Sequence, residues 1–191
     1  MYNSLRDRFW NGRLDTATMR RVEGVAARFD VPEGRFLTAG ELLDQAAAVM
    51  GTALHLCFTA SSRYTGSLLG TADAGPLVIT IDESYRGGGP IETLVAGHEL
   101  GHALGLDGGE VPIEQVPVQI MADQVPDLPP ELLEGLLVLR TRCGGRSRAE
   151  LACEYFGTLL VSRSMPPRHS PTRPGTTGMP GLDSSMGGAQ S

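Results

Sequence analysis

Hydrophobic residues recur at helical spacing in two stretches near the start of the chain. The first covers residues 17–29, inside an arginine-rich segment, and the second runs from residue 39 to Met50. Thr38 and Glu41 have the spacing of a capping box at the start of the second stretch, and Gly51 is placed to end it. Three short apolar runs bounded by turn-forming residues then predict β-strands at residues 53–59, 66–70 and 76–81.

A glycine-bearing helix is expected after these strands. Pro90 follows a glycine triplet and suits the first turn of a helix. Gly97, Gly101 and Gly105 then recur every fourth residue, which places them near one another on the helix surface. A helix face without side chains suits close approach of another helix or a sheet, so we expect tight packing there.

The remaining third of the chain predicts a long loop, two helices and a tail. Residues 107–130 are rich in Gly, Pro and acidic residues, which indicates a loop with one short element near its centre. Helices are expected at residues 131–142 and 147–162. Residues 164–191, dominated by Pro, Gly, Ser and Thr, predict a disordered tail.

With 191 residues, the chain is long enough for one domain with a sizeable core and extensions. We expect an α+β domain over residues 36–163, in which a short three-stranded sheet packs on the glycine-bearing helix and further helices lie C-terminal to it. An arginine-rich helical extension, residues 1–35, precedes this domain, and the tail over residues 164–191 follows it.

The composition of the chain limits the cellular locations and the classes of ligand to be considered. Three cysteines make an odd number without the spacing of a disulfide framework, which predicts free thiols and a cytoplasmic location. The sequence contains no apolar run approaching the ~20 residues of a membrane span, and its first residues lack a signal-peptide apolar stretch. The net charge is −6, and the acidic residues are concentrated in residues 36–162, which argues against nucleic acid as a ligand.

The sequence His-Glu-Leu-Gly-His from His98 to His102 lies within the glycine-bearing helix. Two histidines four residues apart project from one helix face, as two imidazoles must to share a tetrahedral Zn²⁺. Glu99 can reach a water on the metal, whose pKa zinc lowers to about 7, and take its proton as the water attacks a peptide carbonyl. The alternative is a pair of helical histidines without a metal, although polar groups in so apolar a segment need partners.

A catalytic zinc site needs a third protein ligand and an open position for water. His55 lies in a predicted strand, where a half-buried sheet position is the simpler interpretation, and His169 lies in the predicted tail. The metzincin pattern HExxHxxGxxH would end the helix at Gly105 and take its third ligand from the position of Gly108, which cannot coordinate. Asp107 is one residue early for that scheme.

A second helix offers a glutamate as third ligand. Glu150 and Glu154 have the spacing ExxxE, which puts both carboxylates on one helix face. In the gluzincin scheme, Glu150 completes the zinc site, and Glu154 accepts a hydrogen bond from the ring N–H of His98 and fixes its tautomer. The open alternative is that Glu150 belongs to a capping box begun by Ser147 and satisfies only backbone N–H groups.

At these residues the chain resembles the ImmA/IrrE family of metallo-endopeptidases. That family has a short sheet, a helix similar to HELGH, and a later helix with the pattern Glu-x-x-Ala-Asp/Asn-x-Phe-Ala-x-x-Leu-Leu. Residues 150–160 match the Glu and the Phe and contain a leucine pair, Leu159 and Leu160, one residue earlier than in the pattern, while Cys153 and Glu154 replace the Ala and the Asp/Asn. The resemblance covers residues 29–162 and implies a zincin-like fold and a zinc-dependent cytoplasmic endopeptidase. Its implied substrate is a helix-turn-helix repressor or an antitoxin-type regulator.

Two other functions stay open. A non-catalytic regulator that keeps the zincin scaffold would bind a partner protein without cutting it, but the intact Glu99 argues against this function. Direct DNA binding would use residues 19–37, in which residues 25–32 loosely match part of a helix-turn-helix. That stretch is too short for a full DNA-binding domain, and its net charge is small.

Overall fold

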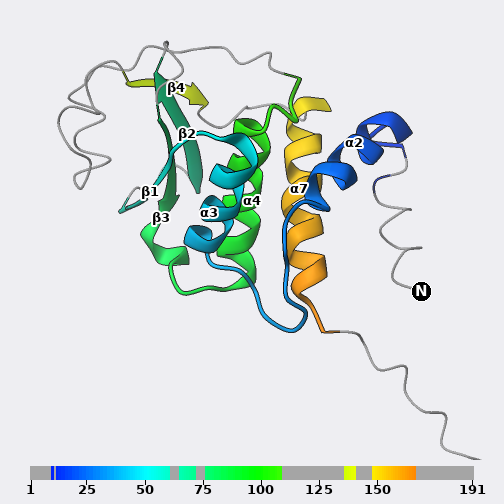
Figure 1. Ribbon diagram of the computed structural model, residues 1–191, viewed down its shortest axis with the longest axis horizontal. Coiled ribbons are helices and arrows are strands. Elements are labelled where there is room, and N and C mark those ends of the chain that lie inside the picture. The colour runs from blue at the N-terminus through cyan, green and yellow to red at the C-terminus, as the bar shows by residue number, and fades with distance from the viewer. Residues whose placement is uncertain are drawn as a thin grey trace, which may run out of the picture.

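A computed structural model of the protein describes residues 10, 12–60, 65–71, 76–108, 136–140 and 148–166. These residues form an α+β structure in which helices pack against a small mixed sheet (Figure 1). None of the helices in this part of the chain is long and apolar enough to cross a membrane. The helices are α2 (Thr16–Ala26), α3 (Ala39–Met50), α4 (Pro90–Ala103) and α7 (Arg148–Ser164), and the strands are β1 (Leu54–Thr59), β2 (Gly66–Thr71), β3 (Leu77–Asp82) and β4 (Leu136–Arg140).

The strand order in the sheet is β1-β3-β2-β4. β3 runs parallel to β1 and antiparallel to β2, and β2 is antiparallel to β4. The first three strands confirm the prediction, and their ends differ from it by at most one residue.

β4 corrects the prediction of a three-stranded sheet and of a helix over residues 131–142, because residues 136–140 form a fourth strand. An unbroken apolar run such as Leu-Leu-Val-Leu carries no period that separates helix from strand. Pairing with β2, a partner far away in the sequence, decides the outcome.

The helices form successive layers beside the sheet (Figure 1). α3 contacts β1, α4 contacts β2 and β3, α7 packs along α4, and α2 covers α7. The ring of Trp10 lies 5.2 Å from that of Tyr155, and Phe29 meets Phe156 edge to face at 5.4 Å. Residues of the predicted N-terminal extension therefore share their hydrophobic core with α7.

Local capping explains where the first two helices begin and end. The Asp15 carboxylate accepts a hydrogen bond from the backbone N–H of Thr18 and caps the start of α2. The helix ends at Ala26, three residues earlier than predicted. The capping box of Thr38 and Glu41 is present at α3, and Gly51 ends that helix in the left-handed region with φ 68°. Residues 109–135, which hold most of the predicted loop, and the predicted tail beyond residue 166 lie outside the described part of the chain.

A buried carboxylate fixes the start of α4. Glu92 is 3% exposed, and its two oxygens accept hydrogen bonds from the backbone N–H groups of Ala39, Gly87 and Gly88 at 2.6–2.8 Å. Ala39 begins α3, so one carboxylate joins the positive ends of two helices, where negative charge is favoured. Thr93 adds a hydrogen bond to the carbonyl oxygen of Leu37 at 2.6 Å.

The contact between α4 and α7 is made through glycines. A Cβ added at Gly97 would lie 2.8 Å from the Cα of Gly157, and one added at Gly101 would lie 3.0 Å from the Cα of Cys153. These distances leave no room for side chains, which confirms the predicted tight packing at the first two of the three repeated glycines. Gly105 differs from them, because its φ of 69° places it in the turn that ends α4.

Candidate metal centre

The glycine contact brings the first turn of α7 beside the last turns of α4. Gly157 meets Gly97, whereas Cys153, four residues earlier in α7, meets Gly101, four residues later in α4. The two helices are therefore antiparallel. Continuing this register by one more turn of α7 carries Glu150 to the face of α4 that bears the two histidines.

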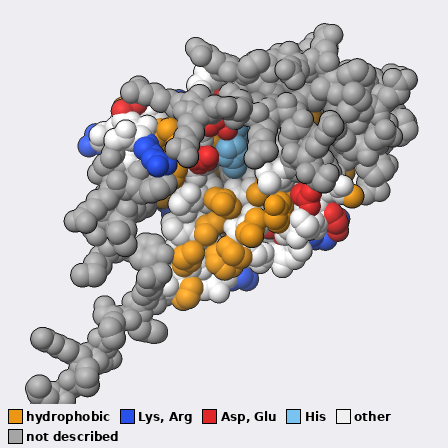
Figure 2. Space-filling model, turned by 180° about the vertical axis from the view of Figure 1, so that it is seen from behind, with side chains coloured by type: hydrophobic (Ala, Val, Ile, Leu, Met, Phe, Trp, Pro, Cys, Tyr) orange, Lys and Arg blue, Asp and Glu red, His pale blue; other side chains and the backbone are white. Residues whose placement is uncertain are grey.

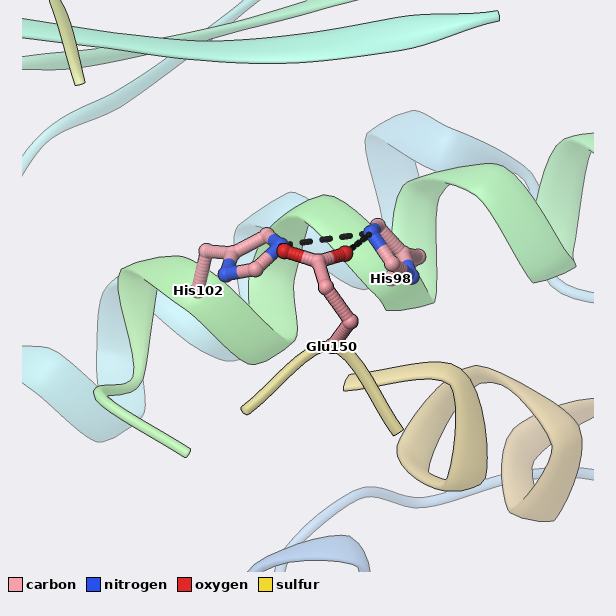
Figure 3. A group of neighbouring side chains, drawn as sticks. All are labelled: His98, His102 and Glu150. Atoms are coloured by element: carbon pink, nitrogen blue, oxygen red, sulfur yellow. Dashed lines mark hydrogen bonds and ion pairs between the residues drawn. The ribbon is translucent and has the colours of Figure 1, made fainter. Parts of the chain in front are cut away.

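His98, His102 and Glu150 point their polar atoms toward one another (Figure 3). The Nε2 atoms of the two histidines are 3.2 Å apart. Oε2 of Glu150 lies 3.3 Å from Nε2 of His98, and Oε1 lies 3.6 Å from Nε2 of His102. Donors about 2.0–2.1 Å from one tetrahedrally coordinated ion lie about 3.3–3.4 Å from one another. The triangle of donors therefore has the size that a single metal ion requires, and these side chains could hold one.

Buried Asp107 favours a cation at this position. Its Oδ2 lies 3.0 Å from Nδ1 of His102, and neither side chain is more than 2% exposed. A carboxylate beside Nδ1 favours a proton on that nitrogen, which leaves Nε2 of His102 with a lone pair directed at Glu150. That lone pair and the Glu150 carboxylate are donors that one metal ion could share.

The turn after α4 positions Asp107. Gly105 adopts its left-handed φ, and the backbone N–H of Leu106 returns to the carbonyl oxygen of Gly101 at 2.9 Å. Arg21 of α2 donates a hydrogen bond to the carbonyl oxygen of Leu106 at 2.7 Å. Asp107, considered as a metzincin ligand from the sequence, instead lies against the ring nitrogen that faces away from the cluster.

Burial is unequal around the cluster. The side chain of His98 is 24% exposed and that of Glu150 is 11% exposed, whereas that of His102 is 2% exposed. The cluster is therefore closed on the His102 side and accessible from solvent at His98. An accessible side is what a water molecule and a substrate would need.

Glu99 is buried between α4 and the sheet. It is 7% exposed, and a Cβ added at Gly66 of β2 would lie 3.0 Å from its Oε1 and 2.8 Å from Cγ1 of Val95. The missing side chain at residue 66 thus leaves the space that the carboxylate occupies. Sequence patterning gave no role to Gly66, because the contact joins two segments that are distant in the chain.

The other sequence-predicted candidates lie away from the cluster or outside the described residues. Glu154 is exposed, and its carboxylate makes no hydrogen bond with His98 in the described part of the chain. The carboxylate that lies against a ring nitrogen facing away from the cluster is that of Asp107, beside Nδ1 of His102. His55 is exposed on β1. Cys153 places its Sγ 3.4 Å from Nδ1 of His102, on the side of the ring away from the donor triangle.

His169 and the capping residue Ser147 are not among the described residues. Because Ser147 lies outside the described residues, the capping role considered for Glu150 stays a prediction. The position of the Glu150 carboxylate between two imidazoles is independent of it.

Comparison with known proteins found no relative of this chain. Neither family models nor curated proteins match the sequence, and no solved structure matches the fold. The functional assignment therefore depends on the residues of the site and on the motifs that they form.

Proposed function

We propose that the protein is a zinc-dependent endopeptidase with a zincin-like fold. The single observation that carries this proposal is the triangle of His98, His102 and Glu150, with edges of 3.2–3.6 Å, two corners of which stand on the helix that also carries the buried Glu99. Two imidazoles and one carboxylate are a ligand set of hydrolytic zinc sites, which keep one position open for water. The accessible side of the cluster at His98 fits that requirement.

Each residue would have a distinct role. His98, His102 and Glu150 would hold the ion, which acts as a Lewis acid on the peptide carbonyl and lowers the pKa of a bound water to about 7. Glu99 would take the proton of the attacking water and pass it to the leaving amine nitrogen. Asp107 would keep His102 in the tautomer and orientation that direct Nε2 to the ion.

The resemblance of both motifs to the ImmA/IrrE family supports a protein as substrate, and a helix-turn-helix repressor or antitoxin-type regulator is the proposed class. A reducing, cytoplasmic location belongs to this proposal, because the three cysteines of the sequence lack the spacing of a disulfide framework.

The test uses Glu99→Gln, which removes the base and keeps the shape of the side chain. Zinc-loaded wild type is expected to cleave members of a quenched fluorescent peptide library, and the variant is expected to lose at least about 100-fold in rate. Glu33→Gln makes the same chemical change at an exposed position and should leave the rate unchanged. Zinc content near one ion per chain in all three proteins would show that the lower rate comes from the missing base and not from a loss of bound zinc.

Full cleavage by Glu99→Gln with zinc retained would refute the assignment of the base. Stoichiometric zinc without cleavage of any peptide or candidate repressor would instead favour the non-catalytic regulator.

A further inference from the structure

Large apolar side chains are exposed on α4 and at the end of α7. Ile91 is 54% exposed, Leu94 is 39% exposed and Met165, directly after α7, is 38% exposed. Figure 2 shows hydrophobic side chains gathered in one band on one face of the molecule, with acidic side chains beyond one end of the band and a histidine on the same face. We call Ile91, Leu94 and Met165 the apolar strip.

The strip begins next to the candidate metal centre. Leu94 and Ile91 precede His98 by one and two helical turns and lie only about 40° and 20° from it around the helix axis. Along the axis they are about 6 Å and 10 Å from His98. The register of the glycine contacts, in which Gly157 meets Gly97, brings the end of α7 and Met165 toward the first turn of α4.

This spacing fits an extended peptide. A peptide in β-conformation advances about 3.3 Å per residue. If its scissile carbonyl lay beside His98, the more exposed histidine of the metal centre, side chains two and three residues away would reach Leu94 and Ile91. Apolar side chains at those positions would remove the exposed surface of the strip from water.

The exposed area of the strip is too small for the interface of a stable dimer. Three side chains that are about half exposed present on the order of 300 Å², well below the roughly 800 Å² that each partner of a stable interface buries. A short peptide segment needs no more than this. Ile91 and Leu94 also share a face of α4 with both histidines, so a segment bound to them lies within reach of the metal centre.

We infer that the apolar strip is a specificity surface for the substrate, binding large apolar side chains two to three residues from the bond that is cut. This inference deepens the proposed function and rests on it. The occupant is a polypeptide segment with Leu, Ile, Met or Phe on one side of the scissile bond.

The first measurement is the cleavage profile of zinc-loaded wild type on a positional-scanning library of ten-residue peptides, with cut sites found by mass spectrometry. Large apolar residues should be enriched at least fivefold over Asp at the second or third position on one side of the cut. In the Ile91→Ser/Leu94→Ser variant the enrichment should fall below twofold, while zinc content stays the same. Met50→Ser, a partly exposed apolar residue at the end of α3, serves as control and should keep the profile.

A second measurement separates failure of this inference from failure of the proposed function. Zinc-loaded Glu99→Gln is titrated with two fluorescein-labelled ten-residue peptides that carry either three Leu or three Asp, and binding is followed by anisotropy. Tighter binding of the Leu peptide, lost when Ile91→Ser and Leu94→Ser are added, supports the strip even if wild type cuts nothing. Equal binding of the two peptides, or a preference that survives the double substitution, overturns it even if wild type is a protease.

Discussion

Replacing Gly157 with alanine changes the spacing between α4 and α7 without altering a candidate metal ligand. The added Cβ would lie 2.7 Å from the carbonyl oxygen of Leu94 and 3.2 Å from the backbone nitrogen of His98. Ordinary contact begins near 3.4 Å, so the helices must separate by about 0.7 Å at this point. Because both contacted atoms belong to the backbone of α4, no change of side-chain rotamer can relieve the overlap.

The separation has two expected consequences. Overpacking of this kind costs about 1–3 kcal/mol, partly offset by the roughly 1 kcal/mol that alanine gains over glycine within a helix. Glu150 stands on α7 and both histidines on α4, so a shift of about 0.7 Å exceeds the tolerance of about 0.2 Å for metal–ligand distances. We expect a net loss of up to about 2 kcal/mol in the free energy of unfolding and at least a tenfold loss of zinc affinity.

Urea unfolding of the metal-free protein measures the first effect, and competition with a chromophoric chelator measures the second. Gly24→Ala is the matched control, because Gly24 is exposed inside α2 and a Cβ there meets nothing within 4 Å. It should stabilise the protein by about 1 kcal/mol and leave zinc affinity unchanged. If Gly157→Ala also stabilised the protein and kept its zinc affinity, the glycine contact would not set the spacing of the ligands.

Asp107→Asn should weaken zinc binding about 10–100-fold in the same chelator titration, because the neutral amide oxygen accepts the hydrogen bond from His102 more weakly and lacks the negative charge of the carboxylate. Unchanged zinc affinity would contradict an orienting role for Asp107. Glu92→Gln should lower the free energy of unfolding by about 2–3 kcal/mol in urea, since its NH₂ group would face a backbone donor, and a change below about 0.5 kcal/mol would contradict this. The hydrogen bond from Arg35, with that from the Thr38 backbone, lowers the pKa of Glu41 from 4.5 to about 2. The stabilisation from ionised Glu41 should therefore be complete above pH 4.5 and be lost as the pH falls through about 2, and ¹³C NMR of the carboxyl group should show a midpoint that rises toward 4.5 in Arg35→Gln.

Local patterns in the sequence were sufficient to predict the helices that carry the candidate metal centre. The capping box at Thr38 and Glu41 set the start of α3, and the spacing of His98 and His102 placed both imidazoles on one face of α4. Glu150 was identified from its motif, and the structure brings it to the two histidines. The first two features depend on residues within about one helical turn of one another, and the third depends on a motif within one helix.

The features that the sequence did not reveal depend on contacts between distant segments. β4 is a strand because β2 pairs with it, and its leucines alone fit a helix equally well. Asp107 reaches His102 only because the chain reverses direction after the left-handed Gly105. No periodicity encodes that reversal, so the sequence did not predict the contact between Asp107 and His102. The role predicted for Glu154, which is exposed, concerned His98 instead and stays a prediction.

The donor triangle is also a cross-link. Two of its corners stand on α4 and the third on α7, so a bound ion would tie together residues 102 and 150 and close the whole intervening chain into a loop. Loop closure reduces the entropy of the unfolded chain, and an ion that binds only the native state raises stability with its concentration. Zinc depletion would then lower the stability of the protein and abolish the proposed activity at the same time. The supply of zinc would therefore control both the amount of folded protein and its activity.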